Sequence, residues 1–215
     1  MHLVMFDIDG TLVDSSDFED ECYQRAIEKV ISRPVDTDWS SYAHATDSGI
    51  LDEIIDRHRL GRHRDTIHRD VKSVFSRYVA SYLAHNGTRE IEGAGAFLRR
   101  LKKRTDVVPA IATGGWEETA KMKLDAAGIN SSGIAFASGS DRTSRTEIMK
   151  TAENRSLSGQ TASKTYFGDA AWDREACRVL GYHFILVGSR IAWKKQIHDF
   201  SQPEKVLSMI GLDAC

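Results

Sequence analysis

Asp7 and Asp9 are the residues of this chain whose types and spacing most clearly predict chemistry. They follow the apolar run 3–6, which is typical of a short buried strand, and they lead into Gly10 and Thr11. Carboxylates at the end of a buried strand are costly to desolvate unless they are paired or bind a metal ion. In such a pair, one carboxylate can attack a phosphorus atom while its neighbour transfers a proton.

Polar residues of matching kinds follow two later apolar runs. Thr113 and Gly114 come after one run, and Asp169 and Asp173 come after another. In an open parallel sheet, sites form at the carboxyl ends of the strands. The Thr113 hydroxyl and the backbone N–H of Gly114 suit a phosphate at a helix start. Asp169 and Asp7 together can hold a hard divalent cation through oxygen, which suits Mg²⁺.

The elements that must position these residues alternate along the chain. Five apolar runs are predicted to be strands: 3–8, 107–112, 134–137, 165–167 and 184–187. Helical patterns or helix caps predict helices at 94–101, 116–127, 146–154, 172–180 and 203–210. This alternation favours an α/β fold with a doubly wound parallel sheet.

The stretch 14–92 interrupts the alternation, since it contains no convincing strand. Its apolar spacing predicts helices at 17–31, 50–59 and 71–85. We therefore expect an all-helical subdomain at 14–92, inserted into an α/β core made of 1–13 and 93–215.

Composition limits the partners of this chain. Its 215 residues include 29 basic and 31 acidic side chains, and the net charge of −2 gives no case for binding nucleic acid or a membrane surface. No run approaches the roughly 20 apolar residues of a membrane helix, and the N-terminus has no signal-peptide pattern. The cysteines Cys22, Cys177 and Cys215 lie far apart and form no metal-binding spacing. These features favour a protein of the reducing cytoplasm.

The motifs together resemble those of the haloacid dehalogenase-like (HAD) hydrolases, in particular the branch of phosphoglycolate phosphatases and β-phosphoglucomutases. Residues 7–12 are similar to the first motif of that family, 111–114 to the second, and 166–173 to the fourth. The insertion at 14–92 resembles the helical cap that the family carries between its first two motifs. The resemblance thus covers nearly the whole chain and implies a Rossmann-like core with a cap.

The resemblance implies a role for each of the motif residues. Asp7 would attack the phosphoryl group and form an aspartyl-phosphate, and Asp9 would act as general acid and then as general base. Thr113 and nearby backbone N–H groups would bind the phosphoryl oxygens. Mg²⁺ would be held by the Asp7 carboxylate, the main-chain carbonyl of Asp9 and Asp169. Asp173 would orient a metal-bound water or the basic residue of the third motif.

The third motif departs from the family pattern, which usually places a lysine before the fourth strand. The segment 141–148 contains no lysine. We expect Arg145 to supply the positive charge beside the phosphate, with Lys150 and then Lys164 as alternatives. Arginine is a fixed bidentate cation and is not interchangeable with lysine.

The segment 41–49 links two predicted cap helices and is polar. His44, Thr46 and Asp47 are candidates for contact with the leaving group of the substrate. A competing interpretation is that Thr46 or Asp47 merely caps the helix that begins near Ile50.

Asp9 favours phosphoryl transfer over the other reactions of the family, because its dehalogenases and phosphonate-cleaving members lack an acid at that position. The resemblance therefore implies a magnesium-dependent phosphatase that acts on a small phosphorylated metabolite. A sugar-phosphate mutase that uses the same intermediate is the alternative. A phospho-acceptor receiver domain or a non-catalytic nucleotide-binding protein fits less well, because the chain is long, carries the insertion and lacks a GxxxxGK[ST] loop.

Overall fold

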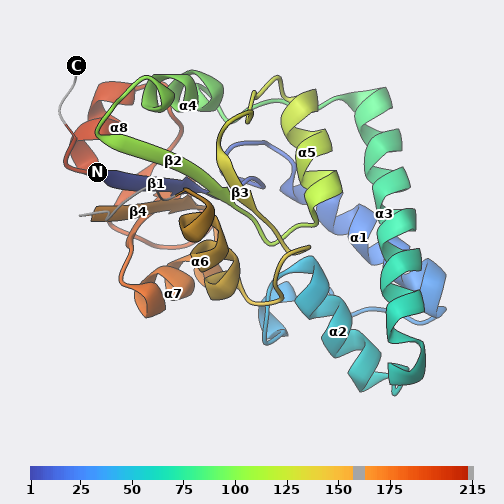
Figure 1. Ribbon diagram of the computed structural model, residues 1–215. Coiled ribbons are helices and arrows are strands. Elements are labelled where there is room, and N and C mark those ends of the chain that lie inside the picture. The colour runs from blue at the N-terminus through green and yellow to red at the C-terminus, as the bar shows by residue number, and fades with distance from the viewer. Residues whose placement is uncertain (157–162, 213–215) are drawn as a thin grey trace.

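The computed structural model describes residues 1–156 and 163–212, which form a six-stranded sheet flanked by helices (Figure 1). All strand pairs in this sheet are parallel, which confirms the predicted α/β class. The sheet order is β3-β2-β1-β4-β5-β6. The strands are β1 (His2–Phe6), β2 (Val107–Ala112), β3 (Ala135–Ala137), β4 (Ser163–Gly168), β5 (His183–Val187) and β6 (Gln196–Ile197). β6 was not predicted, because so short a strand has no measurable periodicity.

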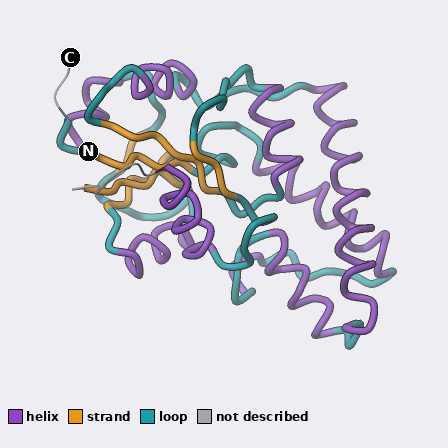
Figure 2. The backbone as a smooth tube through the Cα atoms, in the orientation of Figure 1, coloured by secondary structure: helices purple, strands orange, loops and turns teal. Residues whose placement is uncertain are grey.

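Helices cover both faces of the sheet (Figure 2). One face packs against α4 (Ala94–Lys102), α5 (Glu117–Ala126) and α8 (Pro203–Met209). The other face packs against α6 (Arg145–Ser156) and α7 (Ala171–Leu180). Side chains alternate between these faces along β1, so Val4 and Phe6 lie in the first cluster while Leu3 and Met5 lie in the second.

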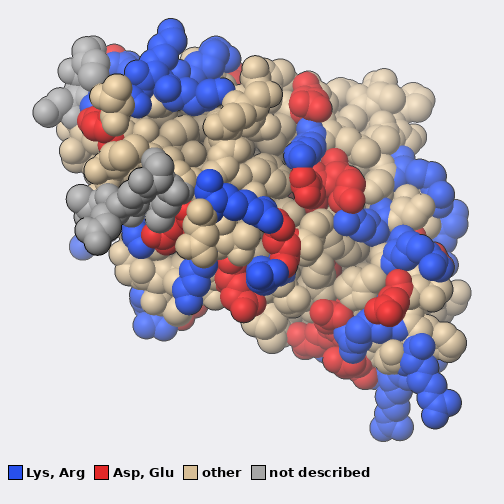
Figure 3. Space-filling view, in the orientation of Figure 1, with Lys and Arg blue, Asp and Glu red and all other residues tan. Residues whose placement is uncertain are grey.

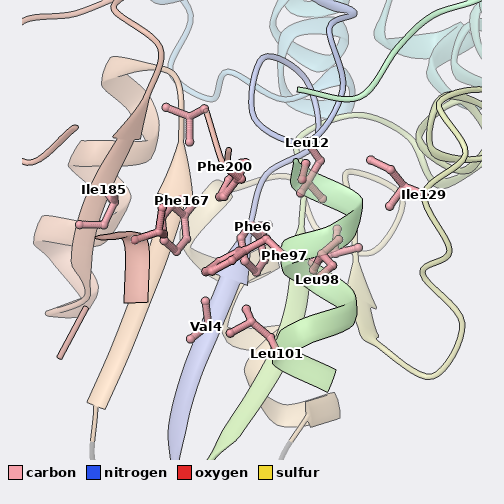
Figure 4. Close-up of a cluster of buried hydrophobic side chains, with 14 of the residues drawn as sticks. Val4, Phe6, Leu12, Phe97, Leu98, Leu101, Ile129, Phe167, Ile185 and Phe200 are labelled. Atoms are coloured by element: carbon pink, nitrogen blue, oxygen red, sulfur yellow. The ribbon is translucent and has the colours of Figure 1, made fainter. Parts of the chain in front are cut away.

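Four phenylalanine side chains pack together between the centre of the sheet and α4 (Figure 4). The rings of Phe6 and Phe167 stack with centroids 5.0 Å apart, and those of Phe97 and Phe200 stack at 5.3 Å. Such pairs stabilise the core beyond the area that they bury. Because Phe6 is the last residue of β1, this packing fixes the point at which the chain delivers Asp7.

Three further helices form a second body beside the sheet (Figure 1). They are α1 (Ser16–Ile31), α2 (Asp47–Arg57) and α3 (Arg64–Asn86), with the short 3₁₀ helices η1 (Trp39–Ser41) and η2 (Gly61–His63). Their apolar faces share a cluster of their own, built around residues such as Tyr23, Leu51 and Phe75. We call this body the cap. The boundaries of 14 and 92 stay a prediction.

The surface and the helix lengths bear on the expected partners. Within the described ranges, none of the helices is long and apolar enough to cross a membrane. On the face drawn in Figure 3, basic and acidic side chains are interspersed, as the small net charge suggests. Cys22 and Cys177 are buried and unpaired, while Cys215 lies outside the described residues.

Candidate active site

The carboxyl ends of β1, β2 and β4 meet at one edge of the sheet, because these strands are parallel neighbours. Asp7 follows β1, Thr113 follows β2, and Asp169 follows β4. A cleft opens at this edge and encloses about 630 Å³, its open mouth included. Its core-side lining is Asp7, Asp9, Thr113, Gly114, Gly115, Arg145, Asp169, Trp172 and Arg190, and its cap-side lining is Glu19, Asp20, Tyr23, Trp39, Ala45, Thr46, Asp47 and Ile50.

Asp7 is a buried carboxylate that is held on both of its oxygens. Oδ1 accepts a hydrogen bond from the N–H of Ile8 at 2.8 Å, and Oδ2 lies 3.1 Å from Nη1 of Arg145. Burial raises the pKa of Asp7, and the guanidinium of Arg145 opposes that rise. The site therefore contains an oriented carboxylate with a cation beside it, an arrangement suited to a nucleophile.

Arg145 begins α6 and reaches over the acidic residues of the site. Its Nη1 lies 3.4 Å from Oδ1 of Asp173, and its Nη2 donates a hydrogen bond to the carbonyl of Ala45 at 3.4 Å. Its Nε is buried and has no hydrogen-bond partner among the described residues. A buried donor without a partner is unfavourable. Arg145 also lines the cleft, so its guanidinium supplies positive charge beside Asp7.

The other basic residues considered for the third motif lie elsewhere. Lys150 is exposed on α6, and Lys164 pairs with Glu153 at 2.5 Å. Neither of them lines the cleft, whereas Arg145 does. A local sequence pattern could not separate the three, because their distances from Asp7 depend on how α6 packs against the sheet.

Asp7, Asp169 and Asp173 form an acidic cluster whose oxygen atoms lie within 4.8 Å of one another. Burial raises the pKa of Asp169 to about 6 and raises that of Asp173 well above its usual range. Arg190 offsets part of the charge, since its Nη1 lies 2.8 Å from Oδ2 of Asp169. The cluster contains three desolvated carboxyl groups, whereas only two guanidinium groups, those of Arg145 and Arg190, lie beside it. A set of oxygen ligands of this kind fits a hard divalent cation.

Asp173 contacts the backbone with one carboxylate oxygen and Arg145 with the other. Its Oδ2 accepts a hydrogen bond from the N–H of Ala170 at 3.2 Å, while its Oδ1 faces Arg145. Gly168 permits this close packing, because a Cβ at that position would lie 2.6 Å from Oδ2 of Asp173. Asp173 thus belongs to the acidic cluster and also has the geometry of a residue that orients Arg145.

Asp9 lines the cleft but lies outside the acidic cluster of side chains. Its Oδ1 accepts hydrogen bonds from the hydroxyl of Ser15 and from Nζ of Lys123, the latter at 2.6 Å. Lys123 also pairs with Glu19 at the start of the cap. Burial raises the pKa of Asp9, but Lys123 and the hydrogen bonds outweigh it, so the pKa lies below its ordinary value. Burial and then the charge of Asp9 raise the pKa of Glu19.

Lys123, Glu19 and Arg190 were not predicted as site residues, although each left a signal in the sequence. Lys123 falls on the buried stripe of α5 next to Leu124, and Glu19 falls on the buried stripe of α1. A charged residue on an apolar stripe indicates a buried polar network. Arg190 follows the end of β5, so the strand-end rule could have found it.

Thr113 and Gly114, the predicted phosphate-binding residues, both line the cleft. The hydroxyl of Thr113 is buried and accepts a hydrogen bond from the N–H of Gly115 at 3.3 Å. A Cβ on Gly114 would lie 2.8 Å from Nη2 of Arg145 and 3.0 Å from the carbonyl of Ala45. Glycine at this position therefore lets Arg145 and the cap approach the end of β2 closely.

The cap loop before α2 docks directly on the core. Thr46 caps α2 by accepting a hydrogen bond from the N–H of Gly49, and its hydroxyl also donates to the carbonyl of Thr143 at 2.6 Å. Oδ2 of Asp47 accepts a hydrogen bond from the N–H of Trp116 at 2.8 Å. Thr46 and Asp47 line the cleft, whereas His44 is exposed and does not. α2 begins at Asp47 because Thr46 is its N-cap.

Comparisons with known proteins agree with this architecture. A family model described as haloacid dehalogenase-like hydrolase matches residues 4–187. No curated protein matches the sequence significantly.

Solved structures of similar fold include CbbY from Rhodobacter sphaeroides in complex with phosphate, at 14% identity and a TM-score of 0.69 over 98% of this chain and 99% of that one. A HAD hydrolase of family IA, variant 3, from Entamoeba histolytica has 17% identity and a TM-score of 0.70 over 98% and 99% of the two chains. An archaeal β-phosphoglucomutase from a Pyrococcus species has 16% identity and a TM-score of 0.58 over 98% and 99%. At these identities the likeness is one of fold.

Proposed function

Because this chain belongs to the haloacid dehalogenase-like hydrolase family, we propose that it is a magnesium-dependent phosphatase acting through an aspartyl-phosphate on Asp7. The observation that carries the proposal is the position of Asp7 itself. It is buried and lines the cleft, its orientation is fixed by two partners, and one of these is the guanidinium of Arg145. This is the environment that an oxygen nucleophile and an incoming phosphate both require.

In the first step, a carboxylate oxygen of Asp7 forms a bond to phosphorus while the ester P–O bond breaks. The electron pair of that bond leaves with the alcohol oxygen, which takes a proton from Asp9. In the second step, water attacks phosphorus, its proton passes to Asp9, and the bond between Asp7 and phosphorus breaks. The products are the alcohol and inorganic phosphate, and both carboxyl groups return to their starting states.

The phosphoryl oxygens need donors throughout both steps. Arg145 offers its guanidinium, and Thr113 and Gly114 line the same cleft and carry a hydroxyl and a backbone N–H group. Donors that are already in place cost no reorganisation when charge develops on the phosphoryl group. We therefore assign phosphate binding to these three residues.

The metal would be held by Asp7 and Asp169, with the main-chain carbonyl of Asp9 as a further ligand and Asp173 close by. A bound Mg²⁺ ion supplies positive charge that offsets the repulsion between the carboxylates and the phosphate. The excess of buried carboxylates over arginines at this end of the cleft supports that assignment.

The substrate is a small phosphorylated metabolite, because the cap covers the cleft. Residues of both the cap and the core line the cleft, so a bound molecule is contacted from two sides, which suits a small molecule. The cap side contributes aromatic, hydroxyl and carboxyl side chains, which suits a hydroxyl-rich or amine-bearing leaving group; these are Tyr23, Trp39, Thr46, Glu19, Asp20 and Asp47. We retain Thr46 and Asp47 as the candidate specificity residues.

The test is phosphate release from p-nitrophenyl phosphate by the wild type and by Asp7→Asn, with Mg²⁺ and with EDTA. Release should depend on Mg²⁺ and fall by at least about 10³-fold in the variant, as loss of a nucleophile does elsewhere. Asp125→Asn is the matched control, because that carboxylate is exposed on α5 away from the cleft. Undiminished release by Asp7→Asn would refute the proposal. Release of nitrophenol without phosphate would instead indicate transfer of the phosphoryl group, as in a mutase.

A further inference from the structure

Lys123 is a buried cation that the two chemical steps do not use. Its side chain is 0% exposed on the inner face of α5, yet it contacts a residue of the cleft. Nζ lies 2.6 Å from Oδ1 of Asp9 and also pairs with Glu19 on α1. Lys123 therefore connects three separate parts of the chain: the loop after β1, the core helix α5 and the first turns of the cap.

A lysine at this position is not explained by packing. Its neighbours on the buried stripe of α5 are Thr119, Ala120 and Leu124, so an unbranched apolar side chain would continue the stripe. Buried ion pairs can often be replaced by apolar groups of similar volume without loss of stability, because desolvation offsets most of their attraction. The ammonium group offsets the negative charge of Asp9 and Glu19, and its contact with Asp9 also constrains that carboxyl group.

The contacts of Asp9 show what that effect is. Both the hydroxyl of Ser15 and the ammonium of Lys123 donate to the same oxygen, Oδ1. Two donors on one oxygen fix the rotation of the carboxyl group. A general acid must hold its proton within hydrogen-bond reach of the leaving oxygen, so its rotation decides how well it works.

We propose that Lys123 is a positioning residue for proton transfer to the leaving group, an inference that rests on the proposed phosphatase function. Lys123 holds the carboxyl group of Asp9 toward the ester oxygen, and Glu19 holds Lys123 from the cap. In the free protein Lys123 lowers the pKa of Asp9, whereas the negative charge of a bound phosphate raises it, so Asp9 takes up its proton with the substrate. That proton moves to the leaving oxygen as the ester bond breaks, and Lys123 neither gains nor loses a proton. Through Glu19, the placement of the acid depends on the cap lying against the core.

A positioning role predicts a dependence on the leaving group that a structural role does not. p-Nitrophenolate is a stable anion that departs without a proton, whereas phenolate departs far more readily when it is protonated. The two phosphate esters share one ring and differ little in shape. A misplaced acid should therefore slow the hydrolysis of phenyl phosphate more than that of p-nitrophenyl phosphate.

The experiment compares kcat/KM for both esters in the wild type, in Lys123→Met and in the control Lys121→Met. kcat/KM reports the steps up to cleavage of the ester bond. Lys121 lies on the same helix, is exposed and pairs with Glu117 at 2.5 Å. In Lys123→Met, the ratio of phenyl to p-nitrophenyl kcat/KM should fall by at least about tenfold, within the usual contribution of general acid catalysis. The ratio should stay unchanged in Lys121→Met.

The double variant Lys123→Met/Glu19→Gln guards against a failure to fold, because it also removes one of the two carboxylates left without a cation. It should show the same fall in the ratio, since Asp9 loses the hydrogen bond from Lys123 in both variants. An equal loss of both activities, or no loss of either, in a variant that folds would overturn the inference on Lys123. Such a result would leave the phosphatase proposal intact, which fails only if Asp7→Asn remains active.

Discussion

Replacing Asp47 with asparagine should stabilise the protein, and increasingly so between about pH 5 and about pH 8. Asp47 is only 9% exposed, and burial raises its pKa to about 7 from an ordinary value of 3.8. The folded protein therefore binds a proton at Asp47 that the unfolded chain has released. Stability is lost as the pH rises from the unfolded pKa to the folded one, and the loss is complete above about pH 7.

The magnitude follows from the difference between the two pKa values. Each pH unit of difference corresponds to about 1.4 kcal/mol, so the raised pKa of Asp47 lowers the stability of the fold by roughly 4 kcal/mol at about pH 8 and by about 1–2 kcal/mol at about pH 5. At the lower pH this loss arises because the unfolded chain ionises there while the folded protein keeps the proton. Asparagine carries no charge and keeps an oxygen that can accept the N–H of Trp116. Its advantage should then grow by about 3 kcal/mol across this interval.

The assay is urea denaturation of both proteins at the two pH values, in EDTA and without substrate, with free energies of unfolding from linear extrapolation. Asp169, whose pKa is also raised, is present in both proteins and cancels in the difference. Glu19 does not cancel, because the charge of Asp47 contributes to the rise of its pKa, and loss of that repulsion adds to the advantage of Asp47→Asn. Asp125→Asn removes an exposed charge and should give the same difference at both pH values. If the advantage of Asp47→Asn does not change with pH, Asp47 is not desolvated as described and the reasoning is wrong.

Three further perturbations test other contacts. Gly168→Ala would place a Cβ 2.6 Å from Oδ2 of Asp173, so it should destabilise the fold by about 1–3 kcal/mol and weaken magnesium-dependent activity, as denaturation and a Mg²⁺ titration would show. Arg190→Gln removes a cation 2.8 Å from Oδ2 of Asp169 that would compete with Mg²⁺ for this carboxylate. Calorimetry should therefore find that Mg²⁺ binds a few-fold more tightly to the variant. Weaker binding would mean that Arg190 orients Asp169 instead. Ser48→Ala removes two hydrogen bonds between cap and core, of 2.7 and 2.8 Å, worth about 1 kcal/mol each. Because the cap would then dock less firmly over the cleft, KM should rise with little change in kcat. A KM equal to that of the wild type would refute this.

The sequence by itself determined the elements of the core and the residues that follow its strands. Short apolar runs and helical spacing are local properties, so the five longer strands and the core helices could be predicted from them. Asp7, Thr113 and Asp169 were found in the same way, because parallel strands deliver their carboxyl ends to one edge. Those predictions needed no knowledge of which strands are neighbours.

Tertiary structure decides which of Arg145, Lys150 and Lys164 lies beside Asp7. All three are near the third motif, but only the packing of α6 places one of them 3.1 Å from Asp7. The network of Lys123 with Asp9 and Glu19 has the same origin. Lys123 lies more than a hundred residues from both Asp9 and Glu19 in sequence, and each of the three alone is an ordinary charged residue.

The docking of the cap is the last feature that only the folded chain reveals. The segment that contains Thr46 and Asp47 could be predicted to be polar and to begin a helix, and it does begin α2. That the same residues also bind the backbone of the core at Thr143 and Trp116 depends on how two separate hydrophobic clusters meet. Local patterns specify which face of a helix is buried, but the partner of that face is selected by the packing of the whole chain.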